Sequence, residues 1–170
     1  RPKLIWWFDD GHGTALSEAA AYLATKDMVG VNSVNSANIG VTDYLTLAQT
    51  LELQNDYDWT MVNHTNSGDE LLSTGNPGGT LSQAQMVAGF EVCKAYLDAN
   101  GLGYYSNVCV YPGNKYTKEL IAELSSLGYR FGRGATAIGG RTPVTCGHPD
   151  APTMWPLKPM AWAFTASLNH

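Results

Sequence analysis

Short apolar segments alternate with longer amphipathic segments along most of this chain. Five short segments predict β-strands: residues 3–8, 28–34, 58–63, 107–111 and 129–132. Four longer segments carry apolar residues at helical spacing and predict helices: residues 14–26, 41–54, 80–100 and 117–127. Strands and helices that alternate in this way predict a parallel β/α architecture with right-handed connections.

The segment 80–100 gives the clearest helix signal. Thr80 and Gln83 form a capping-box pattern at its start, and Gly101 supplies a stop at its end. Its main apolar residues share one face: Met86, Phe90, Cys93 and Leu97. In the second predicted helix, Thr42 is the expected cap residue.

The pattern changes after Gly132. Residues 132–152 are rich in Gly, Thr and Pro and predict a long loop, and residues 160–165 form one further candidate strand. No linker composition interrupts the chain, so we expect a single domain over residues 1–170. The chain begins with Arg1 rather than Met, which indicates a processed or excised piece.

Composition and charge narrow the range of partners. The net charge is −5, so we expect no nucleic-acid partner. No apolar run approaches the roughly 20 residues that span a bilayer, so we expect no membrane segment. The three cysteines, Cys93, Cys109 and Cys146, have no zinc-knot spacing, and the first two are expected to be buried as small apolar side chains.

Chemically capable residues follow three of the predicted strands. Asp9 and Asp10 follow the first, His64 follows the third, and Gly113 lies in a Pro-Gly turn after the fourth. In parallel β/α folds the carboxyl ends of the strands gather at one edge, where functional groups collect. Two adjacent carboxylates there suit a divalent cation and a general base, although capping of the next helix is an alternative.

The order of these segments resembles the polysaccharide deacetylases, the NodB-homology group or carbohydrate esterase family 4. The matching segments are Trp7-Phe8-Asp9-Asp10-Gly11, His64-Thr65-Asn66-Ser67-Gly68, Tyr111-Pro112-Gly113 and Leu127-Gly128-Tyr129-Arg130. The resemblance extends from about Lys3 to Gly132. It implies an irregular (β/α) barrel and a metal-dependent amidase reaction on N-acetylated sugars.

The resemblance also implies roles for individual residues. Asp9 would be the base that activates water, and Asp10 and His64 would be ligands of a metal, most often zinc, with manganese or magnesium as alternatives. The Gly113 N–H would help to hold the oxyanion. The family's last motif provides a general acid, for which His170 in Leu168-Asn169-His170 is the candidate. His148 is a weaker candidate, and an equal alternative is that this motif lies beyond the chain.

The sequence departs from the family pattern at two positions. Gly68 stands where the family has its second histidine ligand. Asp69 is the candidate replacement, which would make a more oxygen-rich site, but Ser67-Gly68-Asp69-Glu70 also reads as a capping box for a short helix through Leu72. His12 is a further nearby imidazole.

The family's base-orienting arginine is the second departure. Its position holds Val110, and Lys115 is the nearest cation in the sequence. We therefore expect Asp9 to lack its usual cationic partner.

Two functions follow as expectations. The first is a hydrolase that removes acetyl groups from an N-acetylated or O-acetylated polysaccharide, such as chitin or a peptidoglycan-type glycan. The second is a pseudoenzyme of the same fold that binds glycan or serves as a structural module. Charged residues are only 15% of the chain, and abundant Asn, Ser and Thr suit an extracellular, cell-surface or virion-associated protein.

Overall fold

The computed structural model describes residues 6–74 and 76–134. The candidate strand 160–165 and the residues Cys146, His148 and His170 lie outside this part of the chain. Five parallel strands form one sheet, in the order in which they occur along the chain. They are β1 (Trp6–Phe8), β2 (Gly30–Val34), β3 (Thr60–Asn63), β4 (Val108–Val110) and β5 (Phe131–Arg133).

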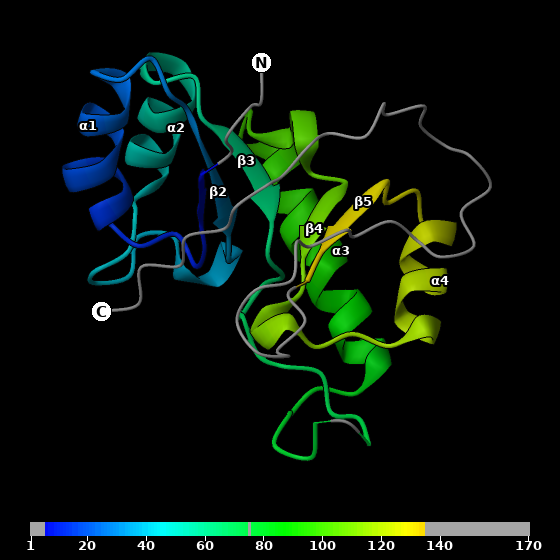
Figure 1. Cartoon of the computed structure of the whole chain (residues 1–170). Helices are drawn as coiled ribbons and strands as arrows, with labels where there is room; N and C mark the ends of the chain where they lie inside the picture. The colour runs from blue at the N-terminus through cyan, green and yellow to red at the C-terminus, as the bar shows by residue number, and fades with distance from the viewer. Residues whose placement is uncertain (1–5, 75, 135–170) are drawn as a thin grey trace.

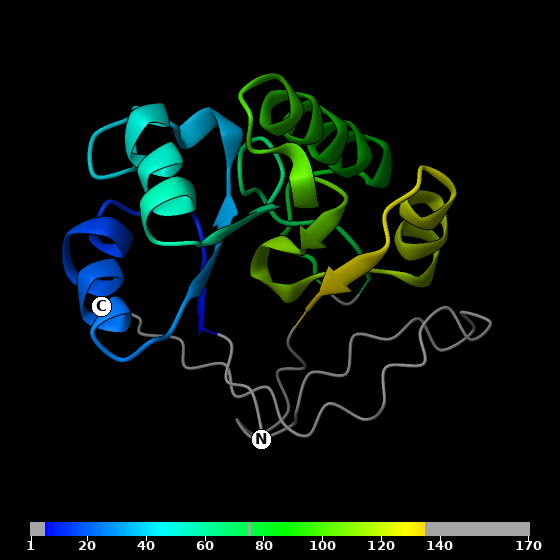
Figure 2. The same ribbon diagram turned by 90° about the horizontal axis from the view of Figure 1, so that it is seen from above.

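Helices cover the outer side of this sheet (Figure 1). They are α1 (Ala21–Ala24), which continues a six-residue π-helical segment at Ala15–Ala20, then α2 (Leu47–Asp56), α3 (Gln83–Ala99) and α4 (Lys118–Ser126). Seen from above, the sheet curls so that its two edge strands face the same interior (Figure 2). The predicted parallel β/α arrangement is therefore confirmed, in the form of a curled half-barrel.

Two helices begin later than predicted. Thr46 caps α2 and Ser82 caps α3, each through a capping box with a glutamine three residues on. The predicted caps Thr42 and Thr80 are wrong, because a second capping signature follows each of them closely in the sequence. The backbone N–H of Thr80 instead donates to the carbonyl of Glu70, which holds this segment beside the loop after β3.

The core has two clusters of buried apolar side chains. One lies under α2 and the start of the sheet and centres on Trp59, Leu53 and Leu45. The other lies under α3 and α4, where the Phe90 ring meets Tyr111 and Tyr129 edge-on at centroid distances of 6.0 and 5.9 Å. The apolar face predicted for residues 86–97 and the burial of Cys93 and Cys109 are confirmed. None of the described helices is long and apolar enough to cross a membrane.

Candidate active site

The functional candidates meet where adjacent strands reach their carboxyl ends. Asp9 and Asp10 follow β1, Asn35 follows β2, His64 follows β3, and Arg133 ends β5. Strand order and parallel direction place all these ends at the same edge of the sheet. Because the sheet curls, this edge is an arc and not a line (Figure 2). The side chains of Asp9, which follows β1, and Arg133, which ends β5, contact each other across it.

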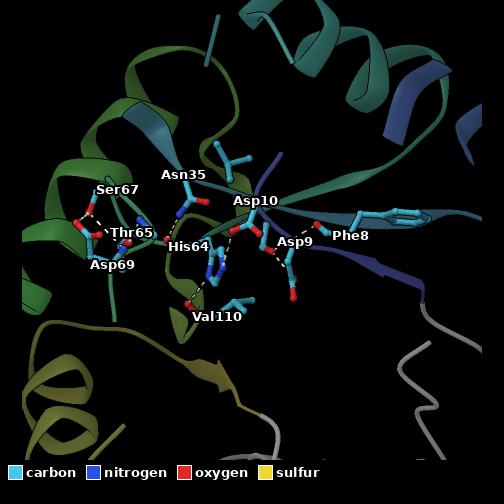
Figure 3. A network of polar contacts seen from close by, with 12 residues as sticks. Phe8, Asp9, Asp10, Asn35, His64, Thr65, Ser67, Asp69 and Val110 are labelled. Carbon is cyan, nitrogen blue, oxygen red and sulfur yellow. Dashed lines mark hydrogen bonds and ion pairs between the residues drawn. The ribbon is translucent and has the colours of Figure 1, made fainter. Parts of the chain in front are cut away.

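Asp10 and His64 form the first pair of the site (Figure 3). His64 Nε2 lies 3.3 Å from Asp10 Oδ1, and His64 Nδ1 lies 2.8 Å from the carbonyl oxygen of Val110. A carbonyl oxygen only accepts hydrogen bonds, so Nδ1 carries a proton. Nε2 therefore either carries the second proton toward Asp10 or offers its lone pair to a cation shared with the carboxylate.

Burial and backbone geometry fix this pair. His64 is buried, with 5% of its surface exposed, whereas the Asp10 side chain is 47% exposed. The hydrogen bond from His64 lowers the pKa of Asp10, against the opposing effect of partial burial. Asp10 has a positive φ of 69°, a conformation that aspartate tolerates better than most residues and that turns its side chain away from that of Asp9.

Asp9 has different partners from its neighbour. Both of its carboxylate oxygens contact the Arg133 guanidinium, and Ser33 Oγ donates to Oδ1 at 2.6 Å. The guanidinium also lies over the Trp7 ring, with its central carbon 4.9 Å from the ring centroid. The expectation that Asp9 lacks a cationic partner is therefore wrong.

Sequence reasoning missed Arg133 because it looked for the arginine two residues before Pro112. Position 110 instead supplies the backbone carbonyl that holds His64. The available signal was an arginine at the carboxyl end of the fifth predicted strand, the same edge as the other candidates.

Gly113 lies in a short turn over Pro112–Asn114 with a φ of 57°. The Glu70 carboxylate lies so close that a Cβ at position 113 would collide with it. Both features favour glycine here. The adjacent carboxylate also disfavours a negative oxygen beside Gly113, and the oxyanion role of its N–H stays a prediction.

Asp69 and His12 are not drawn into the Asp10–His64 pair. The Asp69 carboxylate accepts a hydrogen bond from Ser67 Oγ at 2.8 Å and lies on the far side of Thr65 from His64 (Figure 3). His12 is exposed and stacks on the Tyr44 ring at a centroid distance of 4.7 Å. The helix predicted from the capping box at residues 67–70 is wrong, because these residues are extended or bent and lead to a bridge between Leu71 and Leu81.

The donor set suits a divalent cation only in part. Asp10 and His64 supply a carboxylate and an imidazole, which are common metal ligands. Among residues 6–74 and 76–134, no three His, Cys, Asp or Glu side chains converge to hold a metal ion. At the place of the missing histidine, the Asn35 amide packs against Gly68, with Nδ2 3.2 Å from the position that a Cβ would take.

Comparison with known proteins identifies a family that the chain matches. The family model described as "Polysaccharide deacetylase" matches residues 1–132. A search of curated proteins finds no match.

Solved structures share the fold. The Streptococcus pyogenes deacetylase PplD in complex with acetate has a TM-score of 0.66 and 22% identity, over 76% of this chain and 54% of that one. IcaB from Ammonifex degensii has a TM-score of 0.64 and 18% identity, over 74% of this chain and 57% of that one. The chitin deacetylase of Colletotrichum lindemuthianum has a TM-score of 0.60 and 19% identity, over 78% of this chain and 56% of that one. The chain thus spans little more than half the length of these proteins.

Proposed function

Because the chain belongs to the polysaccharide deacetylase family, we propose that it is a metal-dependent hydrolase that removes acetyl groups from the N-acetylated sugars of a polysaccharide. One observation carries the proposal. Adjacent carboxylates have separate partners, with Asp9 held by Arg133 and Ser33 and Asp10 held by His64. Metal-assisted hydrolysis needs this division between a group that moves a proton and a group that binds a cation.

Asp9 is the proposed general base. Its contacts with the arginine and the serine hydroxyl fix the orientation of the carboxylate. Its side chain is 40% exposed, so that water reaches it. In the proposed reaction Asp9 takes a proton from the water that attacks the acetamide carbonyl.

Asp10 and His64 would hold the cation. When bound there, a divalent metal polarises a carbonyl oxygen and acidifies water. The Val110 carbonyl accepts the hydrogen bond from His64 Nδ1 and so orients the buried imidazole. His64 Nε2 therefore already faces Asp10. The Gly113 N–H and a general acid at His170 remain proposals, and His170 lies outside the described residues.

Two of the solved neighbours support the choice of substrate class. One is a deacetylase with acetate bound, and another is a chitin deacetylase. Acetate is the product expected of this reaction, and chitin is a polymer of N-acetylated sugar. On this basis we propose an N-acetylated glycan as the substrate.

Acetate release from chito-oligosaccharides tests the proposal. Protein stripped with a chelator should release no acetate, and added Zn²⁺, Mn²⁺ or Mg²⁺ should restore release. Asp9→Asn should lower kcat by about 100-fold or more in a folded protein, with a lowered melting temperature because the Asp9 carboxylate also pairs with Arg133. Asp56→Asn, a change of the same kind at an exposed position of α2, is the matched control.

Two results would overturn the proposal. One is full turnover by Asp9→Asn. The other is an absence of acetate release from chito-oligosaccharides with every cation supplied, and release from an O-acetylated polysaccharide alone would assign an ester substrate in place of the amide.

A further inference from the structure

We propose that the side-chain oxygen of Asn35 is the third protein ligand of the cation held by Asp10 and His64. The inference rests on the proposed function, because it assumes a metal at this pair. Asn35 would replace the ligand that the family supplies with its second histidine, at whose position this sequence has Gly68.

Asn35 is buried beside His64, and only the nitrogen of its side-chain amide has a hydrogen-bond partner among the described residues. Only 1% of its surface is exposed, and Nδ2 donates to the backbone carbonyl of His64. No donor among the described residues reaches Oδ1. Buried polar atoms without a partner are uncommon in folded proteins, and a bound ion is one of the causes. In Figure 3 this oxygen turns toward the side on which Asp10 lies.

The missing side chain at position 68 leaves the space that the amide occupies. A Cβ on Gly68 would lie 3.2 Å from Asn35 Nδ2, 3.3 Å from Oδ1 and 3.4 Å from Cγ. The flat face of the amide therefore packs on the Gly68 backbone. Any side chain at position 68 would compete with Asn35 for this volume, and the φ of +76° at Gly68 adds strain for other residues.

Other candidates for the third ligand are less well placed. The Asp69 carboxylate is engaged by Ser67 on the opposite side of Thr65. His12 is exposed and stacked on Tyr44, although it lies close enough to contribute to the lowered pKa of Asp10. Asn32 also has a buried oxygen that none of the described residues satisfies. Side chains alternate along β2, and the neighbouring Ser33 donates to Asp9, so Asn32 lies on the face of the sheet away from the site.

The resulting donor set determines which metals it prefers. One carboxylate, one amide carbonyl and one imidazole give two oxygens and one nitrogen. Carboxylate and carbonyl ligands suit Mn²⁺ and Mg²⁺, whereas each additional imidazole favours Zn²⁺. We therefore expect a smaller preference for Zn²⁺ over Mn²⁺ than a site with two histidines would have.

Binding of Mn²⁺ alone to the whole chain tests the inference without an activity assay. The electron paramagnetic resonance signal of free Mn²⁺ gives the Kd for wild type and for each variant. Asn35→Leu matches the side chain in size and removes both polar atoms, and we expect it to weaken binding by about 10-fold or more. Asn35→Asp keeps an oxygen, adds a charge and removes the N–H donor, and we expect it to bind at least as tightly as wild type. Asn32→Leu is the matched control and should not change the Kd.

The outcomes separate this inference from the proposed function. If wild type binds Mn²⁺, Asp10→Ala abolishes binding and Asn35→Leu does not change it, the metal site stands and Asn35 is not a ligand. Equal weakening by Asn35→Leu and Asn35→Asp would mean that Asn35 acts only through its N–H to His64, which also overturns the inference. A loss of Mn²⁺ binding in His12→Ala with no loss in Asn35→Leu would also overturn the inference. If wild type binds no Mn²⁺, this inference fails, whereas the proposed function stands if Zn²⁺ or Mg²⁺ restores acetate release. If Asn35→Leu does not fold, the Asn35→Asp result decides.

Discussion

Replacement of Arg133 by methionine tests whether the contact across the curled sheet positions the base. Methionine keeps an unbranched apolar stem over the Trp7 ring but removes the guanidinium that contacts both oxygens of Asp9. Among the described residues, Asp9 would then keep only the hydrogen bond from Ser33. The carboxylate would then be free to rotate about its side-chain bonds.

The structure bounds the effect on stability. Exposed ion pairs contribute about 0–1 kcal/mol, whereas loss of one partner of a buried pair costs about 3–5 kcal/mol. The Arg133 side chain is 9% exposed and that of Asp9 is 40% exposed, so the pair lies between these limits. We expect Arg133→Met to lower the free energy of unfolding by about 1–2 kcal/mol, as measured by urea denaturation.

The effect on turnover should be larger. A displacement of a reacting group by about 1 Å can cost about 100-fold in rate. We expect kcat for acetate release to fall by about 10- to 100-fold with little change in KM, because Arg133 acts through Asp9 and not on the substrate. Arg133→Lys restores the charge without the two-pronged contact and should recover part of kcat.

Arg130→Met is the control for these measurements. Arg130 is an exposed arginine three residues earlier, so its loss should leave kcat and stability unchanged. An unchanged kcat in Arg133→Met, or no recovery in Arg133→Lys at restored stability, would refute the positioning role.

Three further predictions concern residues around the site and the fold. Asp69→Ala should leave the Kd for Mn²⁺ unchanged, because the Asp69 carboxylate accepts a hydrogen bond from Ser67. A higher Kd would show that Asp69 is a metal ligand. The hydrogen bond from Lys94 lowers the pKa of Asp98 below 3.8, so this carboxylate adds stability above about pH 4 that is lost as the pH falls further. Asp98→Asn should accordingly reduce the acid-induced loss of stability seen by urea denaturation between pH 6 and pH 3, and an unchanged loss would contradict this. Gly113→Ala should destabilise the chain more than Gly101→Ala. Both positions have a positive φ, but of the two only an alanine at position 113 would collide with a neighbour, the Glu70 side chain. Equal melting temperatures of the two variants would exclude that contact.

The features that the sequence predicted correctly are those that depend on local interactions. Apolar periodicity and cap residues depend on a few neighbours, so the order of strands and helices could be read from the sequence, even though two helices begin at later caps than predicted. Asp10 and His64 were expected at one edge because parallel strands align their carboxyl ends. Their separation of 3.3 Å is the tertiary consequence of that alignment.

The alternation of apolar and amphipathic segments was enough to predict the parallel β/α order and the edge at which the polar residues gather. Which of those residues are partners depends on how the sheet curves in the folded chain. Arg133 and Asp9 are 124 positions apart and lie at the carboxyl ends of opposite edge strands of the sheet, so only the curl of the sheet brings them together. Likewise, Asn35 contacts His64 and Gly68 only because β2 and β3 are neighbours and glycine leaves the volume open. Periodicity fixes where a side chain lies along its own strand, but the curvature of the sheet and the free space around it fix what that side chain contacts.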